Sequence, residues 1–324
     1  MPPASAVEGP QGMPRVNYGF IGLGRMGLPM ALNLREKMPL TSKLFVLDIS
    51  KARIDAFLEQ SRSLGPVEVA SSPKEVAEHC DVIITSLPPG EPARRVFTDP
   101  STSILAAKVD DKSKLVIDTS TLDVQSSLEI RKQIVDSGFG DFVDSPISGG
   151  MEGARRGKLS AIVGGTREVF DQVQPIVLAW SDPDHVYHCG PAGSGLAAKI
   201  INNYIASISY VALCEGMNTG VRFGLDPKVL TDVINASSGM CWNSMHMSPI
   251  KGIHPTSPAS QGFKGGPDGG PGLDLATEST EMTVELMSQV NAKSVMAEVM
   301  RDIWKRASSG YTLSSKPSAP RDIC

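Results

Sequence analysis

The chain has 324 residues, which is enough for two domains with hydrophobic cores of their own. Hydrophobic residues make up 41% of the sequence and charged residues 20%, as in ordinary soluble globular proteins. The net charge of −4 argues against nucleic acid or an anionic membrane as the main partner. Five scattered cysteines form no C-x-x-C pair and share no ligand spacing with the histidines, so we expect free thiols and no metal site.

The first 14 residues contain Pro and Gly and lack the Arg-rich amphipathic pattern of a transit peptide, which predicts a flexible tail without a readable targeting signal. From residue 16 onward, short apolar runs alternate with helical stretches. The runs cover residues 16–22, 43–48, 81–88, 114–120, 141–146 and 158–165, and a helix at 167–180 follows the last of them. Continuous apolar strands separated by helices predict a parallel sheet that is covered on both faces.

After Val186 the strand pattern ends. Residues 193–223 predict one long helix without proline that is apolar over much of its surface, so we expect it to be buried as a domain spine or in a subunit interface. Further helices are expected near 226–236 and 280–308, whereas the composition of 255–273 and 312–324 predicts loops. No apolar stretch is expected to approach the roughly 20 residues that cross a bilayer.

The predicted fold is therefore α/β. It consists of a Rossmann-type doubly wound parallel sheet at 15–185, followed by an all-helical domain for substrate binding or dimerisation at 186–324.

The strongest local motif is Gly22-Leu23-Gly24-Arg25-Met26-Gly27, which lies between an apolar strand and a helix at 25–37. In such a turn Gly22 permits the tight bend, Gly24 lets the backbone approach a pyrophosphate, and Gly27 lets the helix pack closely on the strand. The free N–H groups and positive dipole end of the helix add an attraction for phosphate. The motif therefore predicts a dinucleotide-binding site.

Asp48 ends the next strand and favours NAD over NADP, because a carboxylate there can bind both ribose hydroxyls and repels a 2′-phosphate. A helix N-cap is the alternative role, and one residue can serve both. Leu87 and Pro88 end the apolar run at 81–88, and loops at the carboxyl ends of parallel strands face the cofactor crevice. We expect these two residues to contact the cofactor, with a plain turn as the alternative.

The run FIGLGRMGLPMALNL (20–34) resembles the N-terminal signature of the 3-hydroxyisobutyrate dehydrogenase family of β-hydroxyacid dehydrogenases, which are related to 6-phosphogluconate dehydrogenase. Three further blocks agree with this family in order and spacing, at 118–123, 144–165 and 189–203. A fifth block, 215–242, is similar to the branch that uses 3-hydroxyisobutyrate itself. The resemblance covers about 16–250 and becomes thin after 255.

The resemblance implies that Lys199 is the catalytic lysine, which exchanges a proton with the substrate oxygen during hydride transfer. Such a lysine needs a lowered pKa, which partial burial can supply. Asn203 lies at i+4 on the same helix face and matches an asparagine of the family that holds the substrate hydroxyl or the lysine. Without the motif around it, a single lysine in a helix is usually a solvated surface residue.

Ser148, Gly149 and Gly150 resemble the substrate loop of the family. Two glycines leave backbone N–H groups unshielded, so these residues can form a small anion nest for a carboxylate; a simple turn is the alternative. The resemblance also implies that Thr121 lies near the nicotinamide ribose and Ser120 near the substrate.

The sequence departs from the family in its last third. Relatives usually open a late helix with Lys-Asp-Leu, whereas residues 271–275 read Pro-Gly-Leu-Asp-Leu here. Lys264 could replace the missing lysine only if the glycine-rich segment around it folded inward. Pro92 stands where the family tends to place a polar cofactor contact.

We therefore expect NAD-dependent oxidation of 3-hydroxyisobutyrate to methylmalonate semialdehyde, a step of valine breakdown, with Lys199 moving the proton. The alternatives are a reductase of tartronate semialdehyde, succinic semialdehyde or glyoxylate, and a non-catalytic dinucleotide-binding protein, which the missing late lysine would suit. A 6-phosphogluconate enzyme is disfavoured by chain length, and an imine reductase because those relatives replace the lysine. We expect a homodimer or homotetramer. The resemblance implies the mitochondrial matrix, but the N-terminus carries no signal, so the cytoplasm stays open.

Overall fold

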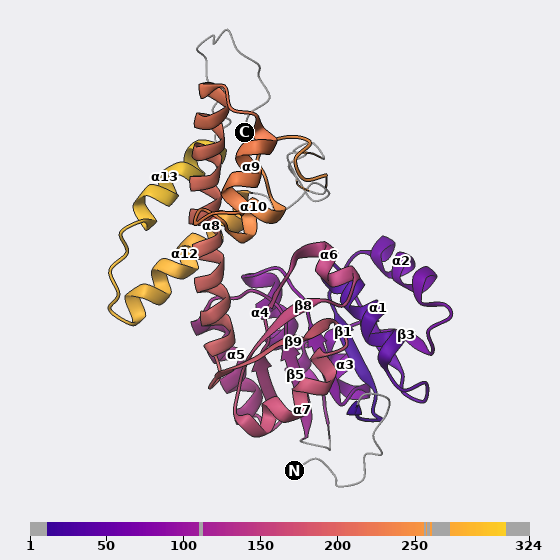
Figure 1. The fold of residues 1–324 in the computed structure, drawn as a ribbon. Helices are drawn as coiled ribbons and strands as arrows, with labels where there is room; N and C mark the ends of the chain where they lie inside the picture. The colour runs from indigo at the N-terminus through magenta and orange to yellow at the C-terminus, as the bar shows by residue number, and fades with distance from the viewer. Residues whose placement is uncertain (1–11, 110–112, 256, 258–259, 261–272, 309–324) are drawn as a thin grey trace. The chain divides into compact units, whose positions relative to one another are not determined.

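The computed structural model describes residues 12–109, 113–255, 257, 260 and 273–308. It divides into two compact units, Met1–Lys199 and Ile200–Cys324, and each is described here by itself (Figure 1). Most of the predicted N-terminal tail, nearly all of the predicted loop at 255–273 with Lys264, and the predicted tail at 312–324 lie outside the described residues.

The first unit is built on a sheet that has nine strands within the described residues, in the order β3-β2-β1-β4-β5-β6-β8-β7, with β9 paired to β8. The strands are β1 (Tyr18–Ile21), β2 (Leu44–Leu47), β3 (Val67–Val69), β4 (Val82–Thr85), β5 (Lys114–Asp118), β6 (Gly140–Asp144), β7 (Ile147–Ser148), β8 (Leu159–Gly164) and β9 (Ser181–Gly190). Strands β1 to β6 are all parallel, whereas β8 runs antiparallel to β6 and β7. The predicted Rossmann-type sheet is confirmed, with a mixed edge.

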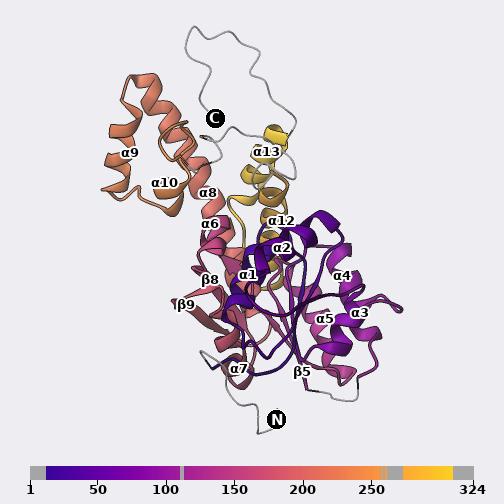
Figure 2. The ribbon, with the colours of Figure 1, turned by 90° about the vertical axis from the view of Figure 1, so that its right-hand side faces the viewer.

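Helices cover both faces of this sheet. They are α1 (Gly27–Lys37), α2 (Lys51–Ser61), α3 (Pro73–His79), α4 (Glu91–Thr98), α5 (Val124–Asp136), α6 (Gly150–Arg155) and α7 (Arg167–Val177). Because side chains alternate along a strand, Phe20 and Ile84 enter a core with α1 and α7, while Ile21 and Ile83 enter a second core with α3, α4 and α5. Figure 2 shows α3, α4 and α5 together on one side of the sheet.

Two edge strands, β3 and β9, were not predicted from apolar runs. In β3 two of three residues are exposed, and in β9 only Ser181 is fully buried. An edge strand pairs with one neighbouring strand and is partly exposed to solvent, so it does not need the continuous apolar run of a central strand.

The second unit consists of helices. It contains α8 (Ser194–Phe223) from Ile200 onward, α9 (Pro227–Asn235), α10 (Trp242–His246), α12 (Leu273–Gln289) and α13 (Ala297–Ser308), and the predicted helical C-terminal region is confirmed. Its small core joins Leu213 and Met217 of α8 to Ile250. The Asn243 amide donates to the Ala206 carbonyl at 2.7 Å and thereby holds α10 against α8.

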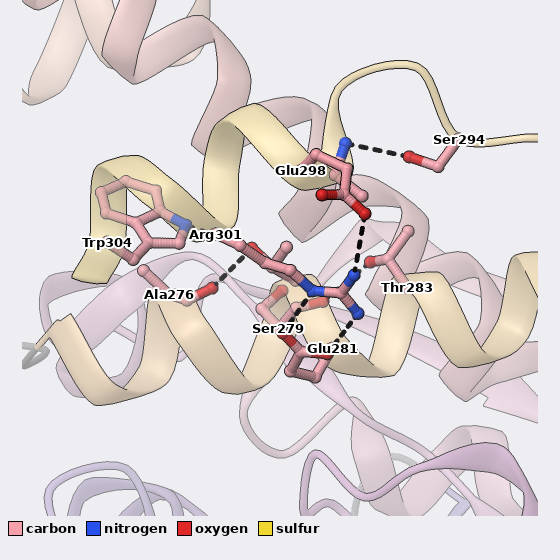
Figure 3. A network of polar contacts seen from close by, with 10 residues as sticks. Ala276, Ser279, Glu281, Thr283, Ser294, Glu298, Arg301 and Trp304 are labelled. Carbon is pink, nitrogen blue, oxygen red and sulfur yellow. Dashed lines mark hydrogen bonds and ion pairs between the residues drawn. The ribbon is translucent and has the colours of Figure 1, made fainter. Parts of the chain in front are cut away.

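The single helix predicted at 280–308 is wrong, because the chain turns between α12 and α13. Asn291 has φ 55° and is the one residue other than glycine with a positive φ in the described chain. Asparagine tolerates this conformation, which ends a helix. Arg301 of α13 then donates to both Glu281 oxygens of α12, at 2.7 and 2.6 Å (Figure 3). Trp304 Nε1 also donates to Thr280 Oγ1 at 3.1 Å.

Helix α8 is exposed over much of its length, so the prediction that it is buried is wrong for the single chain. Only 17% of its most apolar stretch of 18 residues is buried, and Ile205 is 61% exposed. By length and composition α8 is also apolar enough to cross a membrane, which corrects the expectation that no stretch approaches that length. Core helices of soluble proteins pass the same test, so one such helix does not identify a membrane protein.

Candidate active site

The turn between β1 and α1 has the geometry that its glycines predict. Gly22 has φ 99°, and a Cβ there would lie 2.2 Å from the Ser86 carbonyl oxygen. A Cβ on Gly27 would lie 1.9 Å from the Gly22 carbonyl oxygen. Gly24 differs, because no atom lies within 4 Å of its Cβ position. The fold itself therefore requires Gly22 and Gly27, whereas Gly24 keeps open the space that a phosphate would fill.

Asp48 braces this turn from the end of β2. Its Oδ2 accepts from the Leu23 N–H and its Oδ1 from the Ser50 N–H, both at 2.7 Å. Ser50, not Asp48, is the N-cap of α2, so the alternative role as N-cap is corrected. Arg53 lies 3.8 Å from the same carboxylate, whose side chain is only 5% exposed. Each carboxylate oxygen has a further lone pair that can accept a ribose hydroxyl.

The ends of β4 and β5 are joined by a buried network of hydrogen bonds. The Leu87 N–H donates to Ser120 Oγ at 2.9 Å, and this hydroxyl donates to Asp118 Oδ1 at 2.6 Å. Thr85 Oγ1 donates to the same Asp118 oxygen at 2.7 Å. The hydroxyl of Ser120 is thus used to hold the loop at Leu87, and its predicted substrate contact stays a prediction.

Asp118 is a site residue that the sequence analysis did not single out. Its carboxyl is fully buried, its Oδ2 has no hydrogen-bond partner within the described structure, and burial raises its pKa. An acidic residue directly after the apolar residues 115–117 was the available signal. Its role is to fix the two loops that follow β4 and β5.

The predicted substrate loop begins where β7 ends, at Ser148. Gly149 has φ 129° and Gly150 has φ 66°, and both residues are exposed. The Arg25 guanidinium contacts the Met151 sulfur at 3.2 and 3.3 Å, and the Asn33 amide donates to the Ala154 carbonyl at 2.9 Å. These contacts hold α6, which follows the loop at 148–150, against the glycine turn and α1. That the loop and the turn form one shared site stays a prediction.

The remaining predicted cofactor residues have different degrees of exposure. Leu23 is buried, Met26, Leu87 and Thr121 are half-buried, and Arg25 and Pro88 are exposed. Pro92, the departure from the family pattern, lies in the first turn of α4.

Lys199 is the buried lysine of α8. Its side chain is 9% exposed, and burial lowers the pKa of its amine to about 8. An amine with such a pKa exchanges its proton readily near neutral pH, as a general acid or base must. Lys114 is also buried, but its ammonium lies 3.3 Å from Asp81 Oδ1, which makes it a structural ion pair.

Asn202 and Asn203 belong to α8 within the second unit. Asn203 is half-buried and Asn202 is exposed, and the Asn202 amide lies 3.5 Å from Asn203 Oδ1. Asn203, which we predicted to be the site residue, is thus the more buried of the two asparagines.

Comparison with known proteins identifies the family of the chain. Residues 17–190 match the model of the NAD-binding domain of 6-phosphogluconate dehydrogenase, and residues 193–319 match the NAD-binding domain of NADP-dependent 3-hydroxyisobutyrate dehydrogenase. The mitochondrial 3-hydroxyisobutyrate dehydrogenase of Mus musculus is 40% identical over 76% of this chain and 70% of its own length.

The chain belongs to the 3-hydroxyisobutyrate dehydrogenase family. The family enzyme of Bos taurus is 38% identical over 84% of this chain and 79% of its own length. A solved structure of the Mycobacterium tuberculosis 3-hydroxyisobutyrate dehydrogenase with L-serine superimposes with a TM-score of 0.73 and 29% identity, covering 91% of this chain and 94% of that one. As a member of the 3-hydroxyisobutyrate dehydrogenase family, the chain is an NAD(P)-binding oxidoreductase that acts on a hydroxyl group.

Proposed function

We propose that this protein oxidises 3-hydroxyisobutyrate to methylmalonate semialdehyde with NAD, as a step of valine breakdown. The observation that carries the proposal is a buried lysine with a pKa of about 8, Lys199, in the same compact unit as the glycine turn. Inactive relatives would have no need to keep such an amine, which disfavours the non-catalytic alternative.

The cofactor residues fit a dinucleotide. The backbone of Gly22 to Gly27, including Leu23, Arg25 and Met26, would hold the pyrophosphate over the open space at Gly24. Asp48 would accept the ribose hydroxyls and repel a 2′-phosphate, which favours NAD over NADP. Leu87, Pro88 and Thr121 would contact the remaining part of the dinucleotide.

In oxidation, the neutral amine of Lys199 takes the proton of the substrate hydroxyl while the carbon loses a hydride. A bound nicotinamide supplies the acceptor for that hydride. The lysine leaves this step as an ammonium, and in reduction it returns the proton to the carbonyl oxygen. Asn203, one helical turn further along α8, would hold the substrate oxygen through its side-chain amide.

The N–H groups of Gly149 and Gly150 and the hydroxyl of Ser148 would bind the substrate carboxylate, with Ser120 beside them. The relative from Mycobacterium tuberculosis was solved with L-serine, which is itself a small β-hydroxy acid. This supports a substrate of three or four carbons that carries a carboxylate and a hydroxyl group on the β-carbon. Reduction of tartronate semialdehyde, succinic semialdehyde or glyoxylate is the same chemistry on another small acid and is the second candidate.

We further propose that the first unit binds the dinucleotide and that the helical unit serves substrate binding and association into a homodimer or homotetramer. Several relatives carry "mitochondrial" in their names, which supports the mitochondrial matrix as the compartment.

A substrate panel tests the proposed activity. The purified chain should form NADH fastest with 3-hydroxyisobutyrate among small hydroxy acids, and kcat/KM with NAD should exceed that with NADP. Faster turnover of glycerate, 4-hydroxybutyrate or glycolate would replace the substrate assignment. Binding of NAD without turnover of any hydroxy acid would favour the non-catalytic alternative.

A further inference from the structure

A carboxylate, Asp144, occupies a closed slot at the end of β6. Its side chain is 1% exposed. A Cβ on Gly164 would lie 2.5 Å from both carboxylate oxygens, and a Cβ on Gly195 would lie 2.9 Å from Oδ2. Both neighbours therefore have to be glycine for this side chain to fit.

The carboxylate holds the first turn of α8. Asp144 Oδ1 accepts from the Gly193 N–H at 2.7 Å, and Oδ2 accepts from the Leu196 N–H at 2.9 Å. The first hydrogen bond within this helix runs from the Ala197 N–H to the Gly193 carbonyl, so these two amides come before the intrahelical ladder. One side chain from a strand thus does the work that capping residues do in most helices.

Burying an anion is unfavourable, and burial raises the pKa of Asp144 to about 6 despite both amide donors. Asp118, its partner in the register between β5 and β6, adds a second buried carboxyl. A neutral cap on the helix itself would avoid this penalty. The use of a buried carboxylate is explained if the exact position of α8 matters more to this protein than the folding stability lost by burying the charge.

Asp144 also connects two parts of the proposed site. Lys199 lies three residues after Leu196 on α8, and Ser148 lies four residues after Asp144 along the chain. The bonds to Gly193 and Leu196 therefore tie the helix that carries the amine to the strand that leads into the loop at 148–150.

We propose that Asp144 is a positioning residue that fixes the start of α8, and with it the amine of Lys199, relative to the loop that binds the substrate carboxylate. The catalytic consequence rests on the proposed function. Asp144 touches neither substrate nor cofactor, and it acts through the backbone amides that it holds.

Asp144→Asn tests this role, because the variant keeps the shape but turns an N–H group toward one of the two amides. We expect kcat to fall about 10- to 100-fold, since small displacements of a reacting group have effects of this size. The KM for NAD should stay within about twofold, because the glycine turn is untouched. Asp226→Asn is the matched control: its carboxylate accepts from the Val229 N–H at 2.9 Å and caps α9 instead. It should change neither quantity by more than about twofold.

Two measurements do not depend on turnover and separate this inference from the proposed activity. Amide exchange by NMR on the wild type should show Gly193 and Leu196 protected like strand amides, and the Asp144→Asn variant should lose that protection. Acetylation of Lys199, followed by mass spectrometry against pH, should show its midpoint rising from near 8 by about one unit as the amine becomes more solvated.

The proposal is overturned if Gly193 and Leu196 exchange like loop amides in the wild type. It is equally overturned if Asp144→Asn loses that protection while kcat and the acetylation midpoint of Lys199 stay unchanged. If no hydroxy acid is turned over but exchange and acetylation behave as expected, the proposed activity fails and the positioning of Lys199 stands.

Discussion

At the scale of single residues, the proposed chemistry depends on how burial lowers the pKa of the Lys199 amine. Desolvation by burial disfavours the ammonium and is the cause of the lowered pKa. The residue is therefore ready to accept a proton at slightly alkaline pH, whereas an exposed lysine would remain protonated.

The pH dependence of oxidation follows from this shift. Only the neutral amine can accept the hydroxyl proton, so kcat/KM for 3-hydroxyisobutyrate should rise with pH and level off above a midpoint near 8. Reduction of the semialdehyde needs the ammonium and should show the opposite trend. Initial rates in both directions between pH 6 and 10 check this, and a profile without a midpoint between 7 and 9 would assign the proton to another group.

At the same scale, Asp48 is the residue that we expect to set the preference between NAD and NADP. In Asp48→Asn the negative charge is lost while one side-chain oxygen can still brace the turn. We expect the preference for NAD over NADP, measured as the ratio of kcat/KM values, to fall about tenfold. An unchanged ratio would show that Asp48 serves only to brace the turn.

At the scale of elements, the glycine turn separates folding from binding. Gly27→Ala forces a methyl group against the Gly22 carbonyl and should lower the free energy of unfolding by about 1–3 kcal/mol. Gly24→Ala meets no atom and should leave stability unchanged within about 0.5 kcal/mol, yet its methyl group enters the space for the pyrophosphate. Its Kd for NAD should rise at least about tenfold. Denaturant melts and calorimetric titrations measure both effects, and normal NAD binding by Gly24→Ala would contradict the site.

The central elements could be predicted from sequence because burial or a tight turn restricts which residue types fit at their positions. Strands β1, β4 and β5 are buried on both faces and are therefore mostly apolar, and the glycines between β1 and α1 fit few other structures. Edge strand β9 and the turn at Asn291 depend on tertiary neighbours and carry no comparable local pattern.

The same distinction applies to the candidate site, where residues in local motifs could be predicted and residues defined by distant contacts could not. The glycine turn and Lys199 lie in motifs. The buried carboxyl of Asp118, in contrast, accepts from the Thr85 hydroxyl 33 residues away, and that of Asp144 accepts from amides 49 and 52 residues away. Sequence spacing does not show which distant groups meet. The brace of Asp48 on the Leu23 amide was missed for the same reason.

At the scale of the whole molecule, the exposed apolar residues of α8 support the proposed association into an oligomer. Ile201 is 49% and Ile205 61% exposed, although the helix is apolar enough to be a core element. Exposed apolar surface of this kind marks interfaces between proteins.

Ile205→Glu should raise the dissociation constant of the oligomer at least about tenfold, as seen by light scattering at several concentrations. Val69→Glu, at a 45% exposed position of edge strand β3, is the control that should leave the oligomer intact. A monomeric wild type would contradict this expectation.

The most direct test of the central claim is a single-turnover measurement of NADH formation from 3-hydroxyisobutyrate by the wild type and by Lys199→Ala at pH 8. With the amine removed, the rate of hydride transfer should fall about 10²- to 10⁴-fold while the Kd for NAD stays the same. Added methylamine should restore part of the rate. Hydride transfer at the wild-type rate in Lys199→Ala would contradict the claim that this amine moves the proton.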